Sequence, residues 1–124
     1  MDLRISDRIL FIGGGAAPIS AALYHQNSGV EVHVIDHDPW MVVSAKRYMK
    51  KRAYDRVHVR CGALKDIDVT GYTHIVIAKQ VTVDKACLTR ILKDIAPATK
   101  VLVRRKNQKN LGFGLTRTTE LVAG

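Results

Sequence analysis

Two groups of residues that could hold a nucleoside follow successive apolar segments of the chain. Gly13, Gly14 and Gly15 come directly after the apolar run over residues 8–12. Glycine permits a tight turn there and lets the backbone approach a ligand closely. Asp36 ends the next apolar run, at an offset from Gly15 where an acidic residue can accept hydrogen bonds from ribose hydroxyls. This spacing favours an adenosine-type ligand over a turn that the glycines merely shape.

Position 18 makes a dinucleotide the less favoured ligand. In the pattern Gly-x-Gly-x-x-Gly, the third glycine would fall where this chain has Pro18. Proline lacks an amide N–H and adds bulk where the helix should press on the strand. Because pyrophosphate binding at a helix N-terminus depends on free amides, we expect NAD to bind more weakly than an adenosine-type ligand.

The elements that must position these residues are apolar runs alternating with amphipathic segments. Such alternation is typical of a parallel sheet covered by helices on both faces. It predicts strands over residues 8–12, 30–35, 57–61, 73–78 and 100–104, and helices over residues 18–28, 40–54 and 84–95. Residues 107–124 are expected to form a loop followed by either a sixth strand or a frayed tail. We therefore expect one domain over residues 1–124, of the α/β class, with a three-layer, Rossmann-like, doubly wound parallel sheet of five to six strands.

Ligands of an open parallel sheet bind at the carboxyl ends of the strands, where the strand order reverses. We expect the loops after the first four strands to form a cofactor-binding site there. Asp38 with Pro39 would also cap the following helix. The sequence identifies no general base, and its five histidines show no converging set of metal ligands. The residues assigned to the cofactor site are Gly13, Gly14, Gly15, Pro18, Asp36, His37, Asp38, Gly62, Ala63, Ala78 and Lys79.

Composition limits the classes of protein to be considered. The chain has 124 residues, of which 47% are hydrophobic and 25% charged, so it can build a core and is not a disordered chain. No apolar run is long enough to span a bilayer, and two cysteines make no disulfide framework, so we expect a cytoplasmic protein with reduced thiols. The formal net charge of +9 favours anionic partners. Basic residues concentrate over residues 46–60 and 100–109, although a solvated helix face is the simpler interpretation of the first cluster.

Four segments carry a resemblance to a known family. Residues 11–19 resemble the first motif of nicotianamine synthases, Phe-Val-Gly-x-Gly-x-x-Pro-Leu, and residues 36–39 are similar to their Asp-x-Asp-Pro. Residues 78–85 match the pattern Ala-x-x-Val-x-x-Asp-Lys, and Ala96-Pro97 followed by a strand ending at Arg104 resembles the Ala-Pro-Gly…Arg segment. These synthases belong to the class I S-adenosylmethionine-dependent methyltransferase superfamily, and the chain looks like a minimal domain of that kind. Phe11 stands where most methyltransferases of this fold carry an acidic residue, and Ala63 where an Asp near adenine is usual.

The resemblance implies S-adenosylmethionine as the cofactor and S-adenosylhomocysteine or methylthioadenosine as the product. A methyl or a 3-amino-3-carboxypropyl group would pass to a small-molecule acceptor, with Lys79 and Gln80 near the transferred group. Family members also have an N-terminal helical domain, whereas only residues 1–7 precede the first expected strand here. We therefore expect slow or absent turnover by an isolated monomer.

Several alternatives stay open. The chain could be a non-catalytic nucleotide-sensing or NAD-binding module that docks an anionic partner through its basic face, and nucleic acid is a less favoured partner. Trp40 could pack against an adenine or hold its helix onto the sheet. The apolar strand over residues 100–104 would be an unpaired edge, which predicts a homodimer joined there, unless Thr119–Val122 folds back to cover it.

Overall fold

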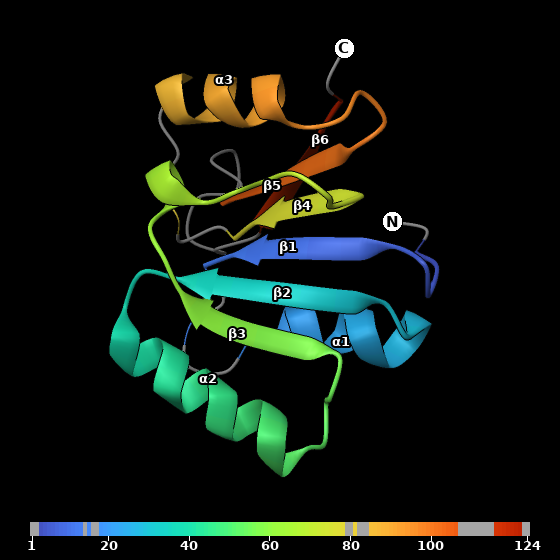
Figure 1. Cartoon of the computed structure of the whole chain (residues 1–124), viewed down its shortest axis with the longest axis vertical. Coiled ribbons are helices and arrows are strands. Elements are labelled where there is room, and N and C mark those ends of the chain that lie inside the picture. Colours follow the sequence, from blue (N-terminus) through green and yellow to red (C-terminus); the bar gives the residue numbers. More distant parts are fainter. Residues whose placement is uncertain are drawn as a thin grey trace.

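The computed structural model describes residues 3–13, 15, 18–78, 81, 85–106 and 116–122; for residues 104–106 and 116–122 it describes the backbone. Strands and helices alternate along the chain, as the hydrophobic pattern predicts (Figure 1). The helices are α1 (Ile19–Ser28), α2 (Pro39–Lys51) and α3 (Lys85–Asp94), with a single 3-10 turn, η1 (Leu64–Asp66). The strands are β1 (Arg8–Ile12), β2 (Glu31–Asp36), β3 (Val57–Cys61), β4 (His74–Ile77), β5 (Lys100–Lys106) and β6 (Thr116–Val122).

The six strands form one sheet in the order β3-β2-β1-β4-β5-β6. The first five are parallel, with β1 in register between β2 and β4. The order reverses at β1, so the crevice for a ligand is expected at the carboxyl ends of β1 and β4. This confirms the Rossmann-like sheet of five to six strands.

The last strand corrects one expectation about β5. β6 pairs with β5 in the antiparallel direction along its whole length, from Lys100 opposite Val122 to Lys106 opposite Thr116. β5 therefore has a partner on each side, and the prediction that it is an unpaired edge is wrong. β5 is covered because the segment Thr116–Val122 is as long as β5 and pairs along that edge.

Alternate residues of the central strands pack into two separate hydrophobic cores, one on each face of the sheet. Ile9 and Phe11 pack in the core on the side of α1 and α2, and Leu10 and Ile12 in the core on the side of α3. Burial on both faces explains why β1 is a continuous apolar run. The three layers are thus a helical layer of α1 and α2, the sheet, and a layer made by α3 and the segment that crosses from β3 to β4.

That crossover is shorter than the others. Residues 62–73 are all described and contain η1 as their one helical turn. Arg90 of α3 fastens the crossover, because its guanidinium donates hydrogen bonds to the carbonyls of Leu64 (2.7 Å) and Ile67 (3.3 Å). The crossover and α3 together bury the second core.

Local sequence sets where the helices begin and end. Gly29 closes α1 in the left-handed conformation with φ +73, and its N–H bonds to the carbonyl of His25 at 2.7 Å. Asp38 caps α2 by accepting the N–H of Trp40 at 2.9 Å, and Pro39 occupies the first turn. Within the residues described, no helix has the length and apolar character needed to cross a membrane.

Candidate functional site

The turn after β1 lies at the point where the strand order reverses. The N–H of Gly13 bonds to the carbonyl of Ile35 (2.7 Å), and the N–H of Ala78 to that of Ile12 (3.0 Å), so the ends of β2, β1 and β4 meet here. Gly13 has φ +86, and a Cβ at this position would overlap Cγ2 of Val81. Glycine is therefore required at position 13 both by backbone conformation and by the close approach of Val81.

Gly15 faces open space. It too has a positive φ, +72, but a Cβ built on it would meet nothing within 4 Å. Open space therefore lies beside the main chain at Gly15, which is the arrangement that a ligand in close contact with the backbone needs.

Asp36 connects this loop to the end of β2. One carboxylate oxygen, Oδ2, accepts the N–H of Gly15 at 2.9 Å, and the other, Oδ1, accepts the N–H of Asp38 at 3.0 Å. The residue is 7% exposed. A carboxylate has about four acceptor positions, so each oxygen can take one further hydrogen bond from a ligand hydroxyl. His37 lies beside it with its side chain 87% exposed, and its Nδ1 is 3.6 Å from Oδ1 of Asp36.

The end of β3 adds a third wall. The N–H of Gly62 bonds to the carbonyl of Asp36 at 3.0 Å, and the thiol of Cys61 lies 3.6 Å from the carbonyl oxygen of His37. A Cβ on Gly62 would approach Cγ2 of Ile35 at 3.2 Å, so the strands pack closely here. Beneath these residues is a hollow of about 160 Å³, lined by Ile35, Arg60, Cys61, Gly62, Ala63, Asp66, Ile67 and Asp68.

Two acidic residues in this hollow were given no role in the sequence analysis. Asp68 closes a local turn, since its Oδ1 accepts both the hydroxyl (2.7 Å) and the N–H (3.0 Å) of Thr70. These bonds hold the pKa of Asp68 below its ordinary value, with the hydroxyl as the larger cause. Asp66 is exposed on the rim. The signal for them was the pair of acids that follows Gly62, at a place where the expected acid is replaced by Ala63.

The predicted site residues are largely brought together. Gly13, Gly15, Asp36, Asp38, Gly62 and Ala78 are joined by the contacts above, His37 and Ala63 flank them, and Pro18 precedes α1 with its carbonyl accepting the N–H of Ala22. Gly14, Lys79 and Gln80 lie outside the described residues. Trp40 is 79% exposed, so the alternative in which it holds α2 onto the sheet is wrong.

Six of the seven cations of the first basic cluster lie on α2 and in the turn that follows it, and the seventh, Arg60, lies on β3. All seven cations between residues 46 and 60 are exposed, while the opposite face of α2 buries Val42, Ala45 and Met49. The second cluster is only partly described, and Lys100 is its one member with a described, exposed side chain.

Comparisons with known proteins agree with this architecture. A scan against protein families finds no match. The chain is 23% identical over 105 residues to the L-histidine 2-aminobutanoyltransferase of Yersinia pestis, covering 85% of this chain and 40% of that protein. A solved structure of a MtNAS mutant in complex with S-adenosylmethionine superimposes with a TM-score of 0.74 at 23% identity, over 82% of this chain and 39% of the other. The chain thus spans about two fifths of these two proteins.

A second solved structure matches over most of its length. An RNA methyltransferase from Salinibacter ruber, solved in complex with S-adenosyl-L-homocysteine, superimposes with a TM-score of 0.79 at 18% identity. The match covers 98% of this chain and 84% of that protein.

Proposed function

Since the chain has the Rossmann-like fold of class I methyltransferases, we propose that it binds S-adenosylmethionine and acts as a transferase domain. The observation that carries this proposal is the bond between Asp36 and Gly15, which joins the ends of β2 and β1 around open space. The L-histidine 2-aminobutanoyltransferase and the two solved structures with bound S-adenosyl ligands support it.

The described residues fit such a cofactor. The ribose hydroxyls would bond to the remaining acceptor positions of Asp36, and the amino acid moiety would lie against the backbone around Gly13 and Gly15. The adenine would enter the hollow after β3, with the exposed ring of His37 against one face. Asp66 on the rim would accept a hydrogen bond from the amino group of the base, a task for which Ala63 has no suitable group.

The cofactor would supply a sulfonium whose bound carbon is open to attack. The acceptor's lone pair would form the new bond to that carbon while the carbon–sulfur bond breaks and its electron pair stays on sulfur. The domain would hold the sulfonium carbon in line with the acceptor. Whether the methyl or the 3-amino-3-carboxypropyl group moves depends on which carbon faces the acceptor, and the Yersinia pestis relative favours the second.

Calorimetry with S-adenosylmethionine, S-adenosylhomocysteine, methylthioadenosine and NAD in parallel tests the proposal. We expect the three sulfur nucleosides to bind and NAD to bind more weakly, because Pro18 removes an amide that pyrophosphate would use. Tighter binding of NAD would favour the alternative of a nucleotide-sensing module. No binding of any of them would refute a nucleoside site.

A second candidate acceptor is RNA rather than a small molecule. The observation that favours it is the exposed basic face of α2, together with the Salinibacter ruber RNA methyltransferase among the structural matches. A Lys50→Glu/Lys51→Glu variant separates the two. If RNA binds there, the variant should have a lower affinity for RNA than the wild type, and that affinity should depend less on salt concentration. Cofactor binding should stay unchanged in either case.

We also keep a homodimer as a proposal, with a different interface from the one first expected. β3 and β6 are the edge strands of the sheet, so a second copy would pair at one of them rather than at β5. Light scattering at tens of micromolar tests this, and a strict monomer there would exclude it.

A further inference from the structure

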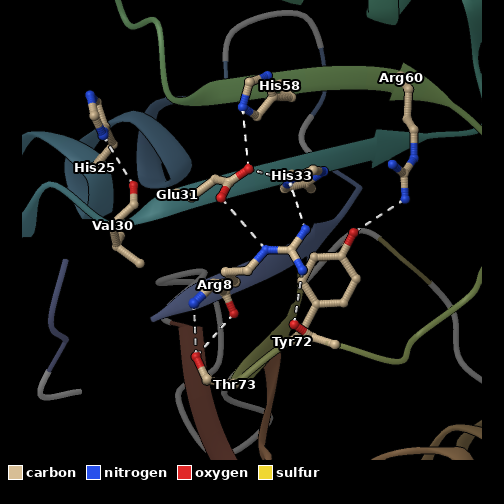
Figure 2. Close-up of polar contacts among 10 residues, drawn as sticks. Arg8, His25, Val30, Glu31, His33, His58, Arg60, Tyr72 and Thr73 are labelled. Carbon is tan, nitrogen blue, oxygen red and sulfur yellow. Dashed lines mark hydrogen bonds and ion pairs between the residues drawn. The ribbon is translucent and has the colours of Figure 1, made fainter. Parts of the chain in front are cut away.

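A cluster of polar side chains occupies the opposite end of the sheet from the proposed cofactor site. Glu31 and His33 are two residues apart on β2 and so point to the same face, and His58 of β3 is the register partner of His33. Figure 2 shows the three side chains converging from these two strands. Oε1 of Glu31 is 2.9 Å from Nε2 of His33 and 3.5 Å from Nε2 of His58, and the three groups offer ligand atoms within 4.8 Å of one another.

The topology explains why such residues stand on a sheet face. Val57 and Val59 of β3 are buried toward α2, so His58 and Arg60 point to the other face. That face is covered by the short crossover with its single 3-10 turn, which leaves the side chain of His58 51% exposed and that of Glu31 26% exposed. Solvent therefore reaches the cluster, although the surrounding sheet is apolar.

From this geometry we propose that Glu31, His33 and His58 form a binding site for a zinc-like divalent transition-metal ion. Two imidazoles and a carboxylate are a donor set that Zn²⁺ takes, and tetrahedral bonds of about 2.0–2.2 Å place donor atoms about 3.3 Å apart. The distances of 2.9 and 3.5 Å from Oε1 of Glu31 lie on either side of that spacing. Because the cluster is partly exposed, water can supply the fourth ligand.

The protonation of the cluster suits a cation. Burial lowers the pKa of His33, so its imidazole is neutral near pH 7, the form that binds metals. The hydrogen bond from His33 is the largest cause that lowers the pKa of Glu31, which therefore stays a carboxylate.

Arg8 is the group that opposes a cation. Its Nη2 lies 3.4 Å from Nε2 of His33, and its Nε is 3.6 Å from Oε2 of Glu31 (Figure 2). The guanidinium also donates to the carbonyl of Gly71 at 3.1 Å and lies over the Tyr72 ring at 5.0 Å, so it keeps partners if it leaves His33. Its contact with Oε2 then orients the carboxylate from behind, as outer partners of metal ligands do.

The proton on His33 cannot satisfy both neighbours. If Nε2 carries it, the ring donates to Glu31 and offers nothing to Arg8; if Nδ1 carries it, Nε2 accepts from Arg8 and faces Glu31 with a lone pair. Nδ1 is buried without a hydrogen-bond partner among the described residues in either case, so it does not distinguish the two states. A metal ion bound to Nε2 would separate the lone pair of that nitrogen from the carboxylate of Glu31, so the two would no longer repel each other.

Such an ion would join β2 to the edge strand β3, far from the carboxyl ends where the cofactor is proposed. The test is calorimetric titration with ZnCl2 of the full chain, after a chelator has removed any metal from the protein. The wild type is compared with the variants Glu31→Gln, His58→Gln and His25→Gln. His25 is the matched control, since it bonds to the carbonyl of Val30 and is not part of the cluster (Figure 2). We expect one ion per chain, an affinity lower by about tenfold or more for the first two variants, and no change for the control.

Cobalt absorption gives a second readout that folding defects do not imitate. Co²⁺ bound by the cluster should show d–d bands of a nitrogen and oxygen site without a thiolate charge-transfer band. A thiolate band would assign the ion to a cysteine, Cys61 or Cys87, and overturn the proposal. So would the absence of Zn²⁺ binding by the wild type, or an affinity that is unchanged in both His58→Gln and Glu31→Gln while their melting curves show folded protein.

Discussion

Asp36 and Gly15 are joined by a hydrogen bond of 2.9 Å from the backbone N–H of Gly15 to the carboxylate of Asp36. The acidic residue at the end of β2 therefore does two things at once. It holds the loop after β1 in place, and it keeps acceptor positions for a ligand. A substitution at Asp36 should affect the stability of the protein as well as the affinity for a ribose.

For Asp36→Ala we expect the free energy of unfolding to fall by about 1–3 kcal/mol, because the N–H groups of Gly15 and Asp38 lose a charged acceptor. Affinity for S-adenosylhomocysteine should fall by a further 1.5–3 kcal/mol, roughly, for lost hydrogen bonds to a charged group. Urea denaturation and calorimetry measure the two effects. Asp55→Ala, at an exposed turn before β3, is the control and should change neither by more than about 0.5 kcal/mol. Unchanged stability of Asp36→Ala would contradict the bracing role.

Gly13 and Gly15 should respond differently to the same substitution. Both have positive φ, so alanine costs about 1–2 kcal/mol of backbone strain at each. Only at position 13 does the new Cβ overlap Val81, which adds about 1–3 kcal/mol for overpacking. Thermal or urea unfolding of Gly13→Ala and Gly15→Ala gives the comparison.

The companion variant Gly13→Ala/Val81→Ala completes a double-mutant cycle. Removing Cγ2 of Val81 should recover part of the loss at position 13, leaving a cost near that of Gly15→Ala. Purely additive effects of the two changes would show that Val81 does not press on the loop.

Arg90→Met should loosen the crossover from β3 to β4. The guanidinium donates to the carbonyls of Leu64 and Ile67, and its removal leaves both without that donor, at about 1–3 kcal/mol of unfolding free energy. Because Asp66 lies between these two residues, affinity for S-adenosylhomocysteine should fall in parallel. Lys93→Met, an exposed change on the same helix, is the matched control. Equal stability of the two variants would contradict the fastening role of Arg90.

Trp40 is the one tryptophan of the chain and is 79% exposed. Its fluorescence should have the emission of a solvated indole and be quenched readily by iodide. Trp40→Ala should change the free energy of unfolding by no more than about 0.5 kcal/mol. Blue-shifted emission protected from iodide would instead mean that the ring is covered, by another molecule or by a second copy of the chain.

The sequence predicted the sheet, and it predicted that most residues of the proposed cofactor site lie at one edge of that sheet, because the signals are local. β1 and β3 were placed at their observed bounds, since β1 is an apolar run followed by glycine and β3 is a short segment with alternating valines. Gly13 and Asp36 could be assigned because the ends of neighbouring parallel strands meet at one edge of the sheet. These inferences need no knowledge of side-chain packing.

Other features depended on contacts that sequence separation conceals. Glu31 and His33 meet His58 because β2 and β3 are parallel neighbours in which His33 is in register with His58. From the sequence, no converging set of metal ligands was expected among the five histidines, because His33 and His58 are far apart along the chain. Likewise, Arg90 holds the crossover because no α-helix lies between β3 and β4. No single residue in the sequence indicates that absence.

The strand order has a consequence for how the protein emerges from the ribosome. β1 is made first and lies inside the sheet; β2 and β3 are then added outward on one side, and β4, β5 and β6 outward on the other. The strand beside which each new strand pairs has thus already been synthesised. The edge of β1 that pairs with β4 stays without a partner strand until β4 has been made. The turn at Gly13 needs Ala78 and Val81 beside it, and both follow β4. A nascent chain that stops at β3 can therefore hold half a sheet but not the complete proposed cofactor site, so the proposed cofactor could assist folding during translation only after β4 has been made.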